Sequence, residues 1–389
     1  MSTALKKINI GIIGYKFMGR AHSNAWKKVS SFFDMPYEPV LKVACGRNEK
    51  NLTEFADRWG WEEIELDWRN LIARDDIDII DIALPQHLHC EIALEAAKAG
   101  KHIFCEKPIA MNSTEAQSML SACEENKVLH YLNHNYRRVP AIALAKKMID
   151  EGLIGKIYHW RSAYQQDWVM NPEFPLTWQL KKDKAQAGPQ WDLNSHCVDL
   201  AHYLVGSILD VTALMSNFIS HRPLAQENTV GNLKALASDA GLGEVTVEDA
   251  ALMLVNFTNG AVGSFEATRF ANGCKNKLTF EIFGSKGSIT FNLEKLNELR
   301  FYSSLDESSI QGYRDIIVTE ENHPYISKWW PPGHIIGYEH TFIHAVADFI
   351  NAISSGDPIH PNFADGLEVI KVLEAGMDSS MEKRTITIK

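Results

Sequence analysis

The chain of 389 residues is longer than one ordinary domain, so its length predicts two domains. Hydrophobic residues make up 45% and charged residues 23%, which excludes a largely disordered chain. The formal net charge of -10, with no Lys/Arg block, argues against a nucleic-acid partner, because phosphate binding needs a clustered basic surface.

The first third of the chain alternates predicted strands with predicted helices. We expect strands at 8–13, 40–45, 77–84, 102–105 and 128–132, and helices at 18–29, 52–59, 66–73, 92–99 and 113–126. This alternation is typical of parallel βαβ units. It predicts an α/β fold whose N-terminal domain, residues 1–139, is a doubly wound parallel sheet of the Rossmann type.

Beyond residue 140 the pattern changes. We expect a helix at 141–151, a strand at 156–166, a loop or lid at 167–190, a helix from about 192 to 204, strands from 211 to 302 with a surface excursion at 221–245, helices at 338–353 and 364–381, and a last strand at 385–388. These elements predict a second, sheet-rich domain over residues 140–389.

The remaining bulk features point to the cytoplasm. No signal-peptide pattern begins the sequence, and no apolar stretch approaches the length of a membrane span, so we expect no membrane partner. The six cysteines form no C-x-x-C pair, and several lie in apolar runs. That usage is typical of reduced core residues.

A glycine-containing turn follows the first predicted strand. Gly14 and Gly19 occupy the first and third glycine positions of the dinucleotide fingerprint, and Lys16 replaces the second. Such turns also occur in folds that bind nothing there. The position of this turn within a βαβ unit is what favours dinucleotide binding. Lys16 either contacts a phosphate or points into solvent.

The second predicted strand ends without the acidic residue that holds the ribose of NAD. Arg47 stands there instead. It either meets the 2′-phosphate of NADP, stacks on adenine or is a solvated loop residue. The predicted cofactor is therefore NAD or NADP.

Lys107 lies directly after the fourth predicted strand, in the run Glu106-Lys107-Pro108. The carboxyl ends of strands line the ligand crevice of an open α/β sheet. An ammonium group there stabilises the alkoxide that develops as hydride leaves an alcohol carbon. A surface lysine in a turn is the alternative. Pro85, His87 and His89 follow the third strand at the same edge.

Asp192 and His196 are four residues apart, which places both on one face of a predicted helix. Alcohol oxidation needs a proton acceptor, and His196 is the candidate base, with Asp192 orienting it or gripping a substrate hydroxyl. A helix cap with an interface histidine is the alternative. His340 and His344 share the spacing but lack a third ligand, so we predict no metal site.

Together these residues resemble the glucose–fructose oxidoreductase/inositol dehydrogenase (Gfo/Idh/MocA) family. The matching pieces are residues 11–14 and 17–19 (including Phe17 and Met18), 84–89 (beginning at Leu84), 99–108, 135–138, 192–196 and 361–366. They span nearly the whole chain in the family's order, and the run A-G-K-H-x-x-C-E-K-P is highly specific.

The resemblance implies a C-terminal α/β domain with a large, mostly antiparallel open sheet that often joins subunits into a homodimer or homotetramer. It assigns the catalytic roles to Lys107, Asp192 and His196. It further places Glu106 and Asn135 beside the nicotinamide, and Tyr136 and Arg137 at the substrate pocket.

Three residues depart from the family pattern, namely Lys16, Gln86 and Trp191, and Trp191 is expected to reshape the pocket mouth. Tyr164, Gln166 and Trp168 are most similar to the levoglucosan and sugar dehydrogenase branch. The implied reaction moves a hydride between a sugar, anhydrosugar or polyol ring carbon and the nicotinamide. An NAD-dependent glycosidase using transient oxidation, and a non-catalytic nucleotide sensor, remain alternatives.

Overall fold

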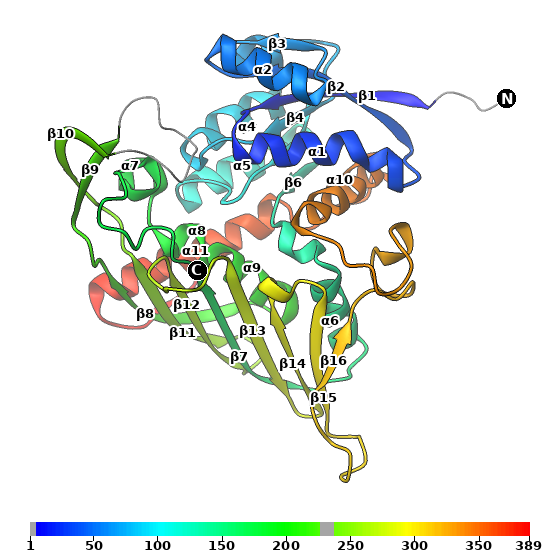
Figure 1. Cartoon of the computed structure of the whole chain (residues 1–389), viewed down its shortest axis with the longest axis vertical. Coiled ribbons are helices and arrows are strands. Elements are labelled where there is room, and N and C mark those ends of the chain that lie inside the picture. Colours follow the sequence, from blue (N-terminus) through cyan, green and yellow to red (C-terminus); the bar gives the residue numbers. More distant parts are fainter. Residues whose placement is uncertain (1–4, 226–236) are drawn as a thin grey trace. The chain divides into compact units, whose positions relative to one another are not determined.

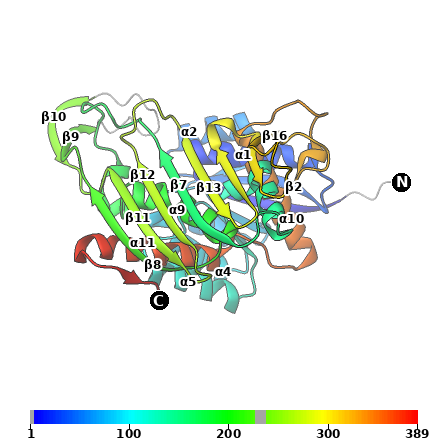
Figure 2. The same ribbon diagram turned by 90° about the horizontal axis from the view of Figure 1, so that it is seen from below.

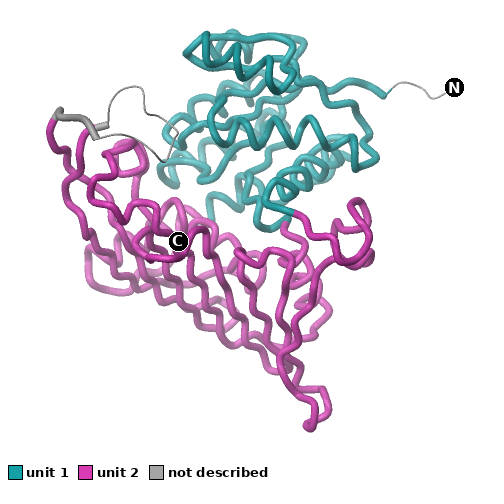
Figure 3. The backbone as a smooth tube through the Cα atoms, in the orientation of Figure 1, with its two compact units in different colours: residues 1–138, 337–368 teal, residues 139–336, 369–389 magenta. Residues whose placement is uncertain are grey.

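The computed structural model describes residues 5–225 and 237–389 (Figure 1). The chain forms two compact units (Figure 3). Unit 1 runs to Arg138 and includes Gly337–Glu368. Unit 2 contains the described part of Val139–Ile336 together with Val369–Lys389. The C-terminal segment of unit 1 lies inside the range 140–389 of the second predicted domain, and the domain boundaries themselves stay a prediction.

The sheet of unit 1 is parallel and has six strands in the order β3-β2-β1-β4-β5-β6. Their bounds are β1 Lys6–Ile13, β2 Tyr37–Cys45, β3 Glu63–Glu65, β4 Ile79–Ile82, β5 His102–Cys105 and β6 His130–Leu132. The strand order reverses between β1 and β4, which makes the carboxyl ends of these two strands a topological switch point. The predicted doubly wound sheet is confirmed.

Three of the helices of unit 1 begin at a residue whose side chain caps them. Their bounds are α1 Phe17–Phe32, α2 Glu49–Trp59, α3 Trp68–Ile72, α4 His89–Lys98, α5 Ser113–Glu125 and α10 Tyr338–Ser355, with the 3-10 turns η1 Gln86–Leu88 and η2 Asn135–Arg138. Asn48, Asp67 and Asn112 each accept a backbone N–H at the start of α2, α3 and α5. Helix α10, distant in sequence, packs against α1.

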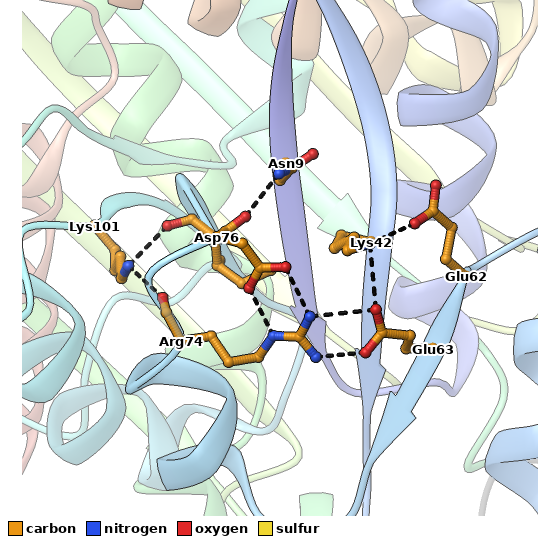
Figure 4. A network of polar contacts seen from close by, with 8 residues as sticks. Asn9, Lys42, Glu62, Glu63, Arg74, Asp76 and Lys101 are labelled. Atoms are coloured by element: carbon orange, nitrogen blue, oxygen red, sulfur yellow. Dashed lines mark hydrogen bonds and ion pairs between the residues drawn. The ribbon is translucent and has the colours of Figure 1, made fainter.

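A network of charged side chains connects the segments at the amino-terminal ends of the strands of this sheet (Figure 4). Arg74 donates to Glu63 at 2.6 Å and to Asp76 at 2.8 Å. Lys101 donates to the carbonyl oxygens of Arg74 and Ile77 at 2.7 and 2.8 Å. Because these contacts fix the turns that precede β4 and β5, we assign them to stability, and the opposite, carboxyl ends of the strands hold the candidate site.

Unit 2 is built on a nine-stranded sheet in the order β16-β15-β14-β13-β7-β12-β11-β8-β17. Its strands are β7 Ile157–Gln165, β8 Ile208–Ser216, β11 Ala250–Phe257, β12 Val262–Thr268, β13 Lys277–Gly284, β14 Gly287–Asn292, β15 Glu298–Ser303, β16 Arg314–Ile317 and β17 Ile386–Thr387. The pairing is antiparallel except between β7 and β12. The large, mostly antiparallel sheet that the family resemblance implies is confirmed.

The predicted surface excursion at 221–245 is only partly irregular. The strands β9 (His221–Ala225) and β10 (Ala237–Glu244) form a separate antiparallel pair. The middle of the excursion, 226–236, lies outside the described residues. Gly and Ala residues hide these strands from sequence analysis, because they carry little of the β-branched pattern that marks a strand.

Among residues 5–225 and 237–389, helices pack against one face of the large sheet only. The remaining helices of the described chain are α6 Pro140–Asp150, α7 Lys182–Ala185, α8 Pro189–Asp192, α9 Asn194–Leu204 and α11 Phe363–Glu382, with the 3-10 turns η3 Trp178–Leu180, η4 Leu293–Lys295 and η5 Ile326–Lys328. Helix α9 packs against β7 and β12, and α8 against β11 and β12. Figure 2 shows the strands in front of α9 and α11. On β11, buried residues alternate with the exposed Leu252 and Leu254, which therefore lie on the uncovered face.

Candidate active site

The glycine turn after β1 has the geometry that a dinucleotide fingerprint requires. Gly14 has a φ of 114°, and a Cβ there would lie 2.3 Å from the carbonyl oxygen of Ala83. A Cβ on Gly19 would lie 2.2 Å from the carbonyl oxygen of Gly14. Neither position accepts a side chain, so the turn keeps its backbone open at the switch point.

Helix α1 presents its N-terminus at this turn. Its first turn holds no acidic residue, and Lys16 precedes it. Phe17 is 59% exposed, which is unusual for an aromatic side chain, and Met18 is half-buried. The free N–H groups and the dipole of a long helix favour a phosphate at such an end. These residues fit the pyrophosphate of a dinucleotide.

The end of β2 carries positive charge. Tyr15 packs on Gly46, where an added Cβ would lie 2.4 Å from the tyrosine ring. Burial, and then the charge of Arg47, lower the pKa of Lys16, so the two cations interact. Neither an Asp nor a Glu stands at 46–48, where the NAD ribose ligand is usual.

Lys107 follows β5 in a turn whose backbone is held by the buried side chain of His89. The peptide bond between Lys107 and Pro108 is cis. His89 is fully buried, and its ring nitrogens lie 2.7 Å from the carbonyl oxygen of Leu84 and 3.0 Å from that of Pro108. His89 therefore links the ends of β4 and β5 from inside the protein. Lys107 and His87 are half-buried at that edge.

Other predicted residues of unit 1 have little exposed surface. The carboxylate of Glu106 is buried and accepts a hydrogen bond from Asn133 at 2.6 Å. Asn135 donates to Thr341 at 2.8 Å. Tyr136 and Arg137 are 4% and 5% exposed. The structure thus brings the predicted residues of unit 1 to the carboxyl edge of its sheet, and several of these side chains point inward.

In unit 2 the helix predicted from about 192 to 204 is confirmed as α9, but it begins two residues later than expected. Helix α8 ends at Asp192, and α9 begins at Asn194, with Leu193 at a φ of -100° between them. Asp192 is therefore the last residue of α8, whereas His196 belongs to α9. The Oδ2 atom of Asp192 instead accepts a hydrogen bond from Arg269 at 2.8 Å. Sequence analysis missed Arg269, because a single arginine after a strand carries no pattern.

A chain of contacts joins the other predicted residues of unit 2. Trp168 donates to the side chain of Gln166 at 2.8 Å, and Gln166 donates to Asn276 at 3.0 Å. Tyr164 donates to the same oxygen of Asn276 at 2.7 Å, and its ring centroid lies 5.8 Å from that of His196. The predicted residues from β7, from the loop after it and from α9 thus belong to one cluster.

Two further residues complete this cluster. The guanidinium of Arg269 lies 5.2 Å from the ring centroid of Trp168. Glu248 accepts the backbone N–H groups of Gly188 and Gln190 at 3.0 and 2.8 Å, at the start of α8. Burial raises the pKa of Glu248, and these two hydrogen bonds oppose that shift. Glu248 anchors the turn that carries Asp192.

Trp191 needs a correction. We expected it at the pocket mouth, but its side chain is fully buried. A ring with no accessible surface belongs to the core of unit 2, and it influences a ligand only by supporting its neighbours.

His344 and His340 make hydrogen bonds with the backbone. His344 lies 2.9 Å from the backbone oxygen of Arg138, and burial lowers its pKa to about 3. His340 accepts the N–H of Gly337. Among residues 5–225 and 237–389, no three His, Cys, Asp or Glu side chains are grouped to hold a metal ion. In the same residues, no helix is long and apolar enough to cross a membrane.

A glycine turn at the switch point of a parallel sheet, with a lysine directly after β5, defines an NAD(P)-dependent oxidoreductase. The comparisons with known proteins agree. The family described as "Oxidoreductase family, NAD-binding Rossmann fold" matches residues 8–134, and the GFO/IDH/MocA C-terminal domain matches residues 142–290. The chain belongs to the Gfo/Idh/MocA family.

Several relatives match along their full length. Levoglucosan dehydrogenase from Pseudarthrobacter phenanthrenivorans is 42% identical, with 99% of each chain covered. A structure of levoglucosan dehydrogenase in complex with NADH and levoglucosan has a TM-score of 0.92 and 42% identity, over 98% of this chain and 100% of that chain. An oxidoreductase domain protein from Kribbella flavida has a TM-score of 0.93 and 43% identity, over 99% of this chain and 100% of that chain.

Proposed function

We propose that this protein is an NAD-dependent dehydrogenase that oxidises a ring hydroxyl of a sugar or anhydrosugar, with levoglucosan as the first substrate to test. Full-length identity of 42% to levoglucosan dehydrogenase supports this substrate class. The observation that carries the proposal is the preserved set of Lys107 after β5 and Asp192 and His196 at the α8–α9 junction.

We assign the residue roles as follows. Residues 1–139 bind the dinucleotide and residues 140–389 bind the sugar. The ammonium of Lys107 donates a hydrogen bond to the reacting hydroxyl and stabilises the negative charge that develops on its oxygen. His196 accepts the hydroxyl proton, while Asp192 holds a neighbouring hydroxyl. When bound, the nicotinamide supplies the hydride acceptor. The ring carbon loses a hydride, the oxygen loses a proton, and a ketone forms.

The cluster of unit 2 suits a sugar. Polyhydroxy rings present C–H faces that stack on aromatic side chains, with hydroxyls that need polar partners at the edges. Trp168 supplies an indole, and Gln166 and Asn276 supply amides in contact with one another. We infer that these residues bind the hydroxyls remote from the reacting carbon.

A substrate panel tests the proposal. Purified protein is mixed with NAD⁺ or NADP⁺ and with levoglucosan, other anhydrosugars, monosaccharides and inositols, and absorbance of the reduced nicotinamide is followed. We expect net reduction of NAD⁺ with levoglucosan or another anhydrosugar. No turnover on any sugar, with weak cofactor binding, would favour the non-catalytic sensor.

Substitution of Lys107 tests its role within the same assay. We expect Lys107→Ala to lower kcat by at least about 100-fold while NADH binding, followed by its fluorescence, stays within about threefold of wild type. Lys98→Ala, which removes an exposed lysine of α4, is the control and keeps wild-type turnover. Near-normal turnover of Lys107→Ala would remove the proposed role.

The alternative glycosidase uses the same groups differently. Transient oxidation acidifies the C–H beside the new ketone, elimination expels the leaving group, and the hydride returns. Release of an aglycone without accumulation of NADH would identify that reaction. Net NADH formation from a free sugar would identify the dehydrogenase.

We further propose that the uncovered face of the large sheet joins two or more copies of the chain. Leu214, Leu252 and Leu254 on β8 and β11 are 56%, 44% and 64% exposed on this face. Apolar side chains gathered on one face mark an interaction surface. Light scattering should give a dimer or tetramer, and Leu252→Lys with Leu254→Lys should reduce its mass. Leu305→Lys, at a site that is 75% exposed, should not.

We also propose a reducing compartment, the cytoplasm. All six cysteines are free, and Cys45, Cys105, Cys123 and Cys197 are buried. Unpaired, buried thiols are typical of proteins that work where disulfides do not form.

A further inference from the structure

A buried polar cluster lies directly behind Lys107 and has no part in the reaction proposed above. His22 of α1 stands between two carboxylates: its Nδ1 is 2.8 Å from Asp81, and its Nε2 is 2.8 Å from Glu106. Asp81 is the single charged residue of β4, and Glu106 immediately follows β5. The side chains of His22 and Asp81 have no exposed surface, and that of Glu106 is 5% exposed.

The hydrogen bonds of this cluster favour one protonation state of His22. The second oxygen of Asp81 accepts the indole N–H of Trp26 at 2.7 Å. The Glu106 oxygen that faces His22 also accepts from Asn133 at 2.6 Å. The amide nitrogen of Asn133 also lies 3.2 Å from Nε2 of His22, but its contact with Glu106 is the shorter one. With Asp81 and Glu106 both ionised, each carboxylate accepts, and each ring nitrogen of His22 donates. Only the imidazolium carries a hydrogen on both nitrogens.

The charges of the cluster balance under this assignment. Asp81 and Glu106 are negative, and His22 and Lys107 are positive. A neutral His22 would leave two buried carboxylates with one cation, and burial strongly disfavours such uncompensated charge. The balance therefore extends from inside the sheet to the proposed catalytic lysine.

We propose that His22 is a positioning residue that stays an imidazolium throughout the working pH range, holds Glu106 as a carboxylate and thereby fixes the place and charge of Lys107. The inference rests on the proposed function only for what Lys107 does. The charge state of His22 is a property of the protein by itself.

The surroundings support a fixed charge. Burial lowers the pKa of His22, but the charges and hydrogen bonds of Asp81 and Glu106 outweigh it and raise the pKa to about 10. The pKa of Glu106 is lowered, because His22, Asn133 and Lys107 together outweigh its burial. On the neighbouring elements, burial raises the pKa of Cys105 and of Tyr338, so both stay neutral. Phe104 and Phe342 close the remaining sides of the imidazole.

For the reaction, this means that the electrostatic field at the ammonium of Lys107 does not change with pH. If Glu106 took up a proton near neutral pH, the ammonium would lose its counter-charge, and the turn between β5 and Pro108 would lose its anchor to α1. An alkoxide-stabilising cation works best when its position is fixed before the reaction starts. His22 keeps this arrangement independent of pH.

The first test reads the charge of His22 directly. Nitrogen-15 spectra of the full chain labelled at histidine are recorded without substrate between about pH 5.5 and 8.5, a range in which an ordinary histidine titrates. The signals of His22 are assigned by their absence from the His22→Gln spectrum, or, if His22→Gln does not fold, by their selective shift in the Asp81→Asn spectrum. We expect two protonated ring nitrogens at every pH. A neutral imidazole at about pH 7 would overturn the proposal, whatever the enzyme oxidises.

The second test uses the charge balance. His22→Gln removes one positive charge, and we expect kcat to fall roughly 100-fold and a new ionisation to enter the pH profile near neutrality. His22→Gln combined with Asp81→Asn removes one charge of each sign. We expect the double variant to lack the new ionisation and to have a kcat at least about tenfold higher than that of His22→Gln, although it disrupts more contacts.

A merely structural role predicts the opposite order. The double variant would then be as slow as His22→Gln or slower, and both pH profiles would keep the wild-type shape. That result overturns the proposal. NADH affinity and thermal unfolding, measured for each variant, separate a change at Lys107 from loss of the fold.

Discussion

Arg269 holds Asp192 from inside the protein: its guanidinium donates to Oδ2 at 2.8 Å and is itself only 2% exposed, whereas Asp192 is 39% exposed. A second nitrogen of Arg269 donates to the backbone oxygen of Gln179 at 3.3 Å. The arginine therefore connects the loop after β7 with the end of α8. One oxygen of Asp192 is thus fixed by a buried arginine, although the side chain of Asp192 itself is partly exposed.

Arg269→Lys should weaken sugar binding more than cofactor binding. Lysine keeps the charge but lacks the planar fork that contacts Asp192 and Gln179 together. We expect the KM for the sugar to rise about tenfold or more, which corresponds to roughly 1.4 kcal/mol, with the Kd for NADH unchanged. Steady-state kinetics and NADH fluorescence measure the two effects. The control is Arg300→Lys, at an exposed pair with Asp315. An unchanged KM in Arg269→Lys would mean that Asp192 needs no anchor.

Gly14→Ala should remove the dinucleotide site. The added methyl group would lie 2.3 Å from the carbonyl oxygen of Ala83, so the backbone has to shift at the switch point. We expect the Kd for NADH to rise by about 100-fold or more if the variant folds.

Gly100→Ala is the matched control for this experiment. Gly100 also has a positive φ, 71°, but a Cβ there meets nothing within 4 Å. It should lose only about 1 kcal/mol of stability and keep its affinity for NADH. Equal affinity for NADH in both variants would contradict the proposal that the dinucleotide binds at the Gly14 turn.

Arg47→Ala should change the choice between cofactors. Arg47 and Lys16 put two positive charges near the end of β2, where residues 46–48 include neither Asp nor Glu, and a 2′-phosphate is the one group that distinguishes NADP from NAD. We expect kcat/KM for NADP⁺ to fall about tenfold, with a smaller change for NAD⁺. Lys50→Ala, at an exposed position of α2, should change neither. Equal losses for both cofactors would show that Arg47 does not discriminate between them.

His344 should make the protein less stable in acid. Its pKa is about 3 in the fold and 6.5 when unfolded, so below about pH 6.5 the unfolded chain binds a proton that the folded chain does not. The stabilisation is complete above 6.5 and falls by about 1.4 kcal/mol for each pH unit down to about pH 3. Urea unfolding of His344→Gln should show a shallower acid slope. A slope that matches wild type, or one that the exposed His221→Gln also changes, would rule this cause out.

The fold was readable from the sequence where hydrophobic runs are long. Ile10, Ile80 and Phe104 lie in mostly apolar runs and have no exposed surface, which is the pattern of a parallel sheet covered on both faces. The three-residue strand β3 was missed, because two of its residues are glutamates and its pairing depends on β2 alone. The strands β9 and β10 were missed because their pairing is not encoded by apolar alternation.

The candidate site was predictable only in part. Lys107 and the glycines of the turn after β1 belong to short sequence motifs, and each motif predicts the role of its residues from a few neighbours in the sequence. Asp81 offered a signal that was available but unused, since a charged residue inside a buried apolar strand requires a partner. Arg269 and Asn276 gave none, because they lie 77 and 112 residues away in the sequence from their partners Asp192 and Tyr164, and only the tertiary fold brings them together.

Direct hydride transfer from a sugar carbon to the nicotinamide is the central step of the proposed reaction, and isotopic labelling measures it. Levoglucosan carrying deuterium on its ring carbons is incubated with NAD⁺, and the reduced cofactor is examined by mass spectrometry. We predict that each reduced nicotinamide carries one deuterium and that one ketone forms for each. Cleavage of the sugar without labelled NADH, or NADH that carries only hydrogen from water, would contradict the account.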